Sequence, residues 1–163
     1  PDGTGEHAAP TEHDVALVVI GETPSAEGFG DIRSGDDLVV EAGSMVNGLM
    51  NPLEPYACSL ELAETHPEDL ACIRRIAAKG IPVAVVLVSG RPLAVGRELA
   101  ASTAFVAAWL PGTEGRGVAE VLVGDSDFKG RLPLPWPGSG DPADGDWQFP
   151  SGFGLSYASS NSR

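Results

Sequence analysis

Basic side chains are scarce in this sequence. Its 163 residues include ten Lys and Arg against 23 Asp and Glu, which gives a formal net charge of −13. Binding to nucleic acid requires a surface of Lys and Arg that neutralises phosphates, and adsorption to anionic lipid requires the same charges. The composition therefore argues against both kinds of partner.

Long apolar segments and targeting signals are also missing. The longest uninterrupted apolar run, residues 104–110, is far shorter than the roughly 20 residues that span a bilayer. Residues 1–13 are polar and contain no basic segment followed by an apolar one, so no signal peptide is recognisable. We interpret residues 1–13 as a flexible lead-in and residues 158–163 as a frayed tail.

Cysteine and histidine are rare. Cys58 and Cys72 either form one disulfide or remain unpaired thiols, and their spacing matches no zinc motif. His7 and His13 lie in the lead-in and His66 lies beside an expected helix start, so no catalytic or metal-binding arrangement is indicated. We expect neither a metal nor a cofactor.

The remaining sequence alternates between strand and helix patterns. Runs of β-branched residues predict strands, and the first run is typical of a strand buried on both faces. Proline and acidic residues at helix starts, Thr113 as an N-cap, and Gly80 as a stop predict the helices. In chain order we expect a strand at 14–21, a helix at 67–79, a strand at 81–88, a helix at 95–101, a strand at 104–110 and a helix at 113–123.

This alternation predicts an α/β fold in one domain over residues 14–157. The expected architecture is a three-layer sandwich: a mostly parallel sheet with helices on both faces. Residues 131–136 look extended, and their two internal prolines confine them to an edge strand. Ligands of such sheets bind at the carboxyl ends of the strands, so we expect the loops that begin at Gly21, Ser89 and Leu110 to converge on one rim.

Two loops resemble known catalytic or binding motifs only in part. Residues 112–117 (GTEGRG) open a helix as phosphate loops do, but their glycine order differs from the dinucleotide motif and Glu114 would repel a phosphate. Ser89 ends a strand without the G-x-S-x-G context of a nucleophilic serine. Trp109 is more typical of a core residue, whereas Trp136 and Trp147 fit either a core or a sugar platform.

Carboxylates on the loop after the first strand are better candidates. Glu22, Glu27 and Asp31 all lie in the segment GETPSAEGFGD. The neighbours of Glu27 are apolar, and such a setting raises the pKa of a carboxyl group by disfavouring its charged form. A glutamic acid that is neutral near pH 6–7 can protonate a leaving group. The alternative is a solvated acidic loop.

Several blocks together resemble the C-terminal, α/β-sandwich domain of glycoside hydrolase family 3, in its bacterial exo-1,3/1,4-β-glucanase and β-glucosidase branch. The SGRP, AWLPGxEG and GRLPxxWP segments in this order carry most of the resemblance. The similar blocks are ALVVIGETPSAEGFGD (16–31), VAVVLVSGRPL (83–93), AFVAAWLPGTEGRGVAEVLVGD (104–125), DFKGRLPLPWP (127–137) and FPSGFGLSY (149–157).

The resemblance implies a retaining hydrolase that acts on β-glucosides or β-glucan oligosaccharides through a covalent glycosyl-enzyme. In that branch the second glutamate of the G-E-x-P-x-x-E loop is the catalytic acid/base, a position that Glu27 occupies here. Asp31, Arg91 and Glu114 match block positions and are expected to support it. Arg91 is a candidate to pair with a loop carboxylate and fix its position.

Departures from the family pattern are equally informative. The family's nucleophile is an aspartate on a separate (β/α)8 barrel domain, for which this sequence has no room, and an earlier strand and helix of the sandwich are not recognisable. We therefore expect an isolated chain with little or no activity, a sheet edge or face that a barrel partner covers, and the family's secreted or periplasmic location. The alternative is a stand-alone α/β carbohydrate-binding or scaffold module without catalysis.

Overall fold

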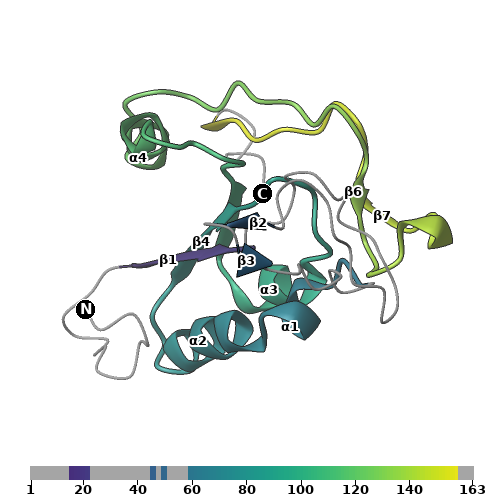
Figure 1. Ribbon diagram of the computed structural model, residues 1–163. Coiled ribbons are helices and arrows are strands. Elements are labelled where there is room, and N and C mark those ends of the chain that lie inside the picture. Colours follow the sequence, from purple (N-terminus) through teal and green to yellow (C-terminus); the bar gives the residue numbers. More distant parts are fainter. Residues whose placement is uncertain (1–14, 23–44, 47–48, 51–58, 158–163) are drawn as a thin grey trace.

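A parallel sheet of three strands lies at the centre of the fold (Figure 1). The computed structural model describes residues 15–22, 45–46, 49–50 and 59–157. The strand order is β1-β4-β5, and the strands are β1 (Ala16–Gly21), β4 (Val83–Val88) and β5 (Ala104–Ala107). β1 pairs with β4 from Ala16 opposite Val83 to Gly21 opposite Val88. The predicted α/β class is confirmed.

Some predictions fall on residues that are not described. Glu27, Asp31 and Cys58 lie outside the described residues, as do the lead-in at 1–13 and the tail at 158–163.

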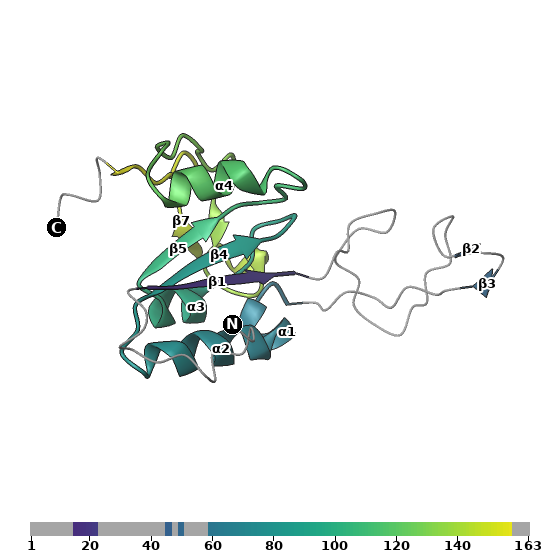
Figure 2. The ribbon, with the colours of Figure 1, turned by 90° about the vertical axis from the view of Figure 1, so that its left-hand side faces the viewer.

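Helices lie on both sides of the sheet, as predicted. Figure 2 shows α1, α2 and α3 on one side and α4 on the other. Within the described residues, no helix has the length and apolar character needed to cross a membrane. The helices are α1 (Leu62–Thr65), α2 (Pro67–Ala77), α3 (Gly96–Ala101) and α4 (Gly115–Leu122).

The sequence of α2 accounts for both of its ends. Pro67 occupies the first turn, where its missing N–H costs nothing, and Glu68 and Asp69 complement the positive end of the helix dipole. Beyond the last turn, Gly80 adopts a φ of 80°, a conformation that favours glycine. The buried residues Leu70, Ile73 and Ile76 form one face of this helix.

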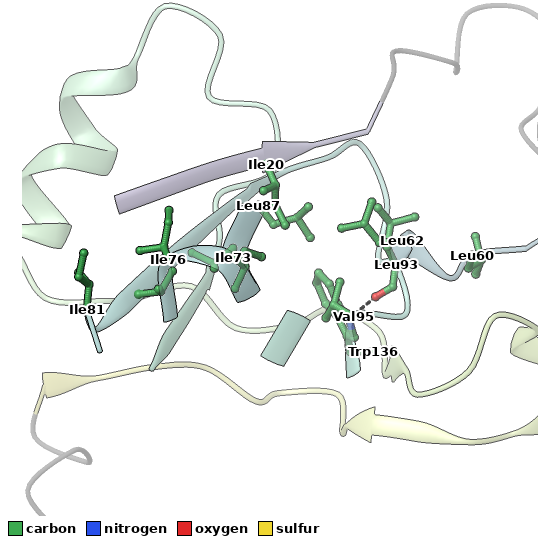
Figure 3. Packing of buried hydrophobic residues seen from close by; sticks show 12 residues of the cluster. Ile20, Leu60, Leu62, Ile73, Ile76, Ile81, Leu87, Leu93, Val95 and Trp136 are labelled. Carbon is green, nitrogen blue, oxygen red and sulfur yellow. Dashed lines mark hydrogen bonds between the residues drawn. The ribbon is translucent and has the colours of Figure 1, made fainter. Parts of the chain in front are cut away.

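The core lies on the face of the sheet that α2 covers (Figure 3). Alternate residues of β4 point into it, among them Val85 and Leu87, both fully buried. Trp136 is also part of the core, and its Nε1–H donates a hydrogen bond of 2.7 Å to the carbonyl oxygen of Leu93. Burial of each such side chain contributes about 1.5–3 kcal/mol. The core members drawn in Figure 3 are Ile20, Leu60, Leu62, Ile73, Ile76, Ile81, Val83, Val85, Leu87, Leu93, Val95 and Trp136.

The opposite face of β1 is open, and the prediction that this strand is buried on both faces is wrong. Val15 and Leu17 are each 56% exposed and Val19 is 62% exposed, although all three are apolar. β1 is an edge strand, and α4, which lies on this side of the sheet, has no buried residue. No described element therefore covers this part of the sheet.

Short two-stranded sheets complete the structure. The edge strand expected near 131–136 is confined to β6 (Trp136–Pro137), which pairs with β7 (Trp147–Phe149) in an antiparallel sheet of its own. The prolines of this segment lack the N–H groups that a longer ladder would need. β2 (Met45–Val46) and β3 (Leu49–Met50) form another antiparallel pair, and Pro142–Asp144 form a 3₁₀ turn.

We expect Trp136→Phe to destabilise the fold by at least about 2 kcal/mol, because it leaves the Leu93 carbonyl without its donor and opens a void. The free energy of unfolding in urea measures the loss. Trp147, which is 48% exposed, provides the control, and Trp147→Phe should change that free energy by less than about 0.5 kcal/mol. Equal effects of the two changes would contradict the core role of Trp136.

Candidate active site

The carboxyl end of β1 is fixed tightly against β4. A Cβ atom on Gly21 would lie only 2.8 Å from the carbonyl oxygen of Val88, so the two backbones approach as closely as they do because residue 21 is glycine. The next N–H, that of Glu22, donates to the same carbonyl at 3.2 Å. On its other side, the backbone of Gly21 acts on the carboxyl of Asp69 on α2 and opposes the burial that raises the pKa of that carboxyl. Glu22 therefore begins its loop from a rigid position.

Arg91 reaches Glu22 from the loop after β4. Its Nε and Nη2 atoms lie 2.6 and 2.5 Å from Oε1 of Glu22, although the two residues are 69 positions apart. The pair is shielded from water, since the side chains of Arg91 and Glu22 are 15% and 7% exposed. Charge-assisted hydrogen bonds of this kind are about twice as strong as neutral ones. The pair therefore connects the ends of β1 and β4.

Ser89 supports the backbone from which Arg91 extends. Its side chain is buried, and its hydroxyl donates a 2.7 Å hydrogen bond to the carbonyl oxygen of Arg91. This contact closes a tight turn directly after β4. Ser89 thus has a structural partner, which agrees with the absence of a nucleophile motif around it.

The loop after β5 lies beside the loop after β4. A Cβ atom on Gly90 would be 3.5 Å from Cδ1 of Leu110, which is ordinary contact distance. Between β5 and this leucine, Trp109 adopts a φ of 56°, a strained conformation for a bulky residue. Its ring packs edge-on against Trp136, with centroids 5.9 Å apart, and it contacts the core as predicted. The three loops therefore meet at one rim.

The predicted site residues separate into three groups. The structure brings Arg91 to Glu22, the first carboxylate of the acidic loop. Glu114 lies on an exposed turn before α4, and the Thr113 hydroxyl lies 3.4 Å from its Oε1. The prediction that Thr113 caps this helix is wrong, because its hydroxyl makes no capping hydrogen bond. Glu27 and Asp31 lie outside the described residues.

A small hollow runs along the outer edge of β1, between this strand and α2. Its volume is about 290 Å³. Burial raises the pKa of Asp69 in its wall, and the charge of Glu68 adds to that effect, against the opposing effects of His66 and of the Gly21 backbone. The lining residues are Val18, Val19, Ile20, Glu68, Asp69, Cys72 and Arg75.

The described part of the site supplies an anchor and no complete reaction centre. Arg91 neutralises Glu22 and holds it in place, which suits a positioning role better than proton transfer. Among the residues that the structure describes, no three His, Cys, Asp or Glu side chains gather as a metal site would require.

We expect Arg91→Met and Glu22→Gln to be coupled in stability. Either change alone leaves one charged group buried without its partner, and the double change removes both, so the coupling free energy should be roughly 1–3 kcal/mol. Urea unfolding of the two single variants, the double variant and the parent chain measures it.

Arg116 and Glu120 offer a matched control in the same molecule. Their Nε and Oε1 atoms are 2.7 Å apart, but the side chains are 89% and 37% exposed. Arg116→Met and Glu120→Gln should therefore couple by no more than about 0.5 kcal/mol. A coupling at Arg91 and Glu22 as small as this would show that the buried pair does not hold the rim together.

Comparison with known families gives a match over nearly the whole chain. A family model described as the glycosyl hydrolase family 3 C-terminal domain matches residues 4–157. The chain is 34% identical over 128 residues to the lysosomal beta glucosidase of Dictyostelium discoideum, which covers 77% of this chain and 12% of that protein. It is 41% identical over 68 residues to the periplasmic beta-glucosidase of Salmonella typhimurium, covering 41% and 9% of the two chains.

A solved structure agrees with these relatives. The Q683A mutant of the exo-1,3/1,4-beta-glucanase ExoP from a Pseudoalteromonas species superposes with a TM-score of 0.70 at 41% identity. The match covers 94% of this chain and 22% of that one. The chain thus spans about a tenth to a fifth of the length of the proteins that it matches.

Proposed function

Because the chain belongs to the glycosyl hydrolase family 3 C-terminal domain family, we propose that it carries the general acid/base of a retaining β-glucoside or β-glucan exo-hydrolase. The observation that carries this proposal is the buried Glu22–Arg91 pair. It fixes the point from which the segment GETPSAEGFGD leaves the sheet, and Glu27 follows five residues later. A proton donor has to be held within reach of the glycosidic oxygen. The chemistry therefore requires that the segment carrying the donor starts from a fixed position.

Glu27 acts twice in the proposed mechanism. In the first step its carboxyl group donates a proton to the glycosidic oxygen while the bond from that oxygen to the anomeric carbon breaks. A carboxylate nucleophile bonds to the same carbon from the opposite face and forms the glycosyl-enzyme. In the second step the Glu27 carboxylate takes a proton from water, whose oxygen displaces the nucleophile. Retention of anomeric configuration follows from the two displacements.

The other candidates support Glu27 in different ways. Arg91 acts through Glu22 and is a positioning residue. We assign Asp31, at the end of the same loop, to the same support. Glu114, on the exposed turn after β5, is assigned to the rim that faces the substrate.

The nucleophile is proposed to lie on a (β/α)8 barrel, either in the same polypeptide or in a partner chain. Two carboxyl groups roughly 5–5.5 Å apart are needed for retention, and this chain is proposed to contribute one. The open face of β1 supports the proposal of a polypeptide partner. Its exposed apolar surface lies beside the hollow along the same strand and is formed by Val15, Leu17 and Val19. The relatives named as periplasmic and lysosomal enzymes support a secreted or periplasmic location.

The isolated chain should bind a hydrophobic dye or self-associate through the open face of β1. Replacing Leu17 and Val19 together by Thr keeps β-forming residues and reduces the apolar surface, so dye fluorescence and apparent mass should both fall. Light scattering and dye titration measure these effects. The matched control is Val123→Thr, since Val123 is 72% exposed but lies at the end of α4. A monodisperse parent chain that binds no dye would contradict the proposed interface.

A chimeric enzyme tests the catalytic proposal. Residues 4–157 replace the matching part of the Pseudoalteromonas exo-glucanase, which supplies the rest of the enzyme. We expect this chimera to hydrolyse aryl β-glucosides, and the isolated chain to show little or no turnover. Glu27→Gln in the chimera should lower kcat by roughly 10²–10⁴-fold on substrates with poor leaving groups, because these need the proton. Azide should restore turnover of aryl glucosides whose leaving group departs without a proton, because it displaces the nucleophile without a base, and it should not rescue substrates with poor leaving groups.

The control is Asp125→Asn, an exposed acid in the turn after α4, which should leave kcat unchanged. A chimera in which Glu27→Gln has no effect on kcat would refute the acid/base assignment. A folded chimera that binds glucosides without turnover would instead favour a carbohydrate-binding module.

A further inference from the structure

Glu98 is a buried carboxylic acid that the proposed reaction does not use. It lies in α3, is 0% exposed, and with Ser89 is one of two polar residues buried among those described. Neither of its carboxyl oxygens has a hydrogen-bond partner of good geometry. An ionised carboxylate in such a place would lose its hydration without compensation. The position therefore strongly disfavours the charged form.

A second acid, Glu61, lies directly before α1, and its charge acts on Glu98. Its Oε1 is also buried without a hydrogen-bond partner, although the Nε of Arg97 lies 3.6 Å away. The charges acting on Glu98 are those of Glu61, of Arg97 on its own helix and of Arg74 on α2. Arg97 is half exposed and also lies 3.9 Å from Glu64, so its charge is shared and partly solvated.

The direction of the electrostatic effects is consistent with this geometry. Burial raises the pKa of Glu98, and the charge of Glu61 raises it further, while its own backbone N–H, Arg97 and Arg74 oppose the rise. Burial also raises the pKa of Glu61, against Arg97. The two acids therefore resist ionising together, as like charges in one site do.

The segments that carry these acids are joined by backbone hydrogen bonds. Glu61 and Ala94 form a parallel β-bridge. The Leu62 N–H donates to the carbonyl oxygen of Ala94 at 3.0 Å, and the Ala94 N–H donates to the carbonyl oxygen of Leu60 at 2.9 Å. Ala94 lies three residues beyond Arg91 and four before Glu98. A change of charge at Glu98 thus acts on the segment that also holds the rim.

We propose that the buried Glu98, while it carries its proton, forms with Glu61 a pH-sensitive latch that holds α3 and the 93–95 segment against residues 60–62. While Glu98 is neutral, the bridge between Glu61 and Ala94 is stable. When Glu98 loses its proton, two negative charges face each other in a poorly hydrated place, and the bridge opens. This inference does not depend on the acid/base assignment of Glu27.

The pH dependence has a definite sign. Because the folded state binds this proton more tightly than the unfolded state, the stability that Glu98 contributes is fully present below the ordinary Glu pKa of about 4.3. It then falls as pH rises through the higher pKa of the folded state. Most buried acids with a cationic partner would show the opposite trend.

The test compares the full 163-residue chain with Glu98→Gln, which keeps the shape and removes the titration. From pH 4.5 to pH 8 the melting temperature of the variant minus that of the parent should rise by on the order of 3 °C or more. Asp125→Asn, at an exposed position, is the control and should show no such trend. Protection of the Leu62 and Ala94 amides from hydrogen exchange should fall with pH in the parent relative to Glu98→Gln. A pH-independent difference in melting temperature would overturn the proposal.

A second measurement needs no Glu98 variant and holds even if that variant fails to fold. NMR of the parent chain with ¹³C-labelled Glu carboxyls should show one signal that titrates above the usual Glu range, as burial of Glu98 requires. Glu61→Gln should move that titration to lower pH, because it removes the facing charge. If every Glu carboxyl of the parent titrates in the usual range, or Glu61→Gln leaves the midpoint unchanged, the latch is refuted.

Discussion

The parallel pairing of β1 with β4 is the constraint on which the rest of the structure depends. It places Gly21 opposite Val88, so the chain leaves both strands at the same level and Glu22 meets Arg91 across 69 residues. A one-residue slip would put a side chain where only glycine fits and would turn the apolar residues of β1 to the wrong face. The ion pair at the rim is therefore a consequence of strand register, and it stabilises that register in return.

The two faces of the sheet differ in what they provide. On the α2 side a closed core, with Trp136 at one end, accounts for the stability of the chain as a folded unit. On the other side β1 exposes Leu17 and Val19, and no residue of α4 is buried. The reaction proposed above takes groups from two polypeptide units, and it requires that water be excluded between them. An apolar face next to the rim suits that requirement, and it would be a liability for a domain that worked alone.

The sequence predicts the part of the fold that packs within this chain, on the α2 side of the sheet. The positions of β4 and α2, the parallel order and the meeting of three loops at one rim follow from β-branched runs, helix-end residues and chirality. The sequence does not predict that one face of β1 is exposed, because an apolar run has the same pattern whether this chain or another polypeptide covers it. The acid pair was also missed, since Glu98 sits between Arg97 and Leu99 in a short helix and reads as part of a solvated face.

Burial alone does not decide what a carboxylate does, as Glu22 and Glu98 demonstrate. Both are removed from water, but Glu22 has a guanidinium group at 2.5 Å, whereas neither carboxyl oxygen of Glu98 has a hydrogen-bond partner and the charge of Glu61 acts on it. The first arrangement fixes a geometry, while the second favours the neutral form of Glu98 and makes a local structure sensitive to pH. A well-packed apolar residue in place of Glu98 would be at least as stable. Stability therefore does not account for an acid at that position, whereas sensitivity to protons does.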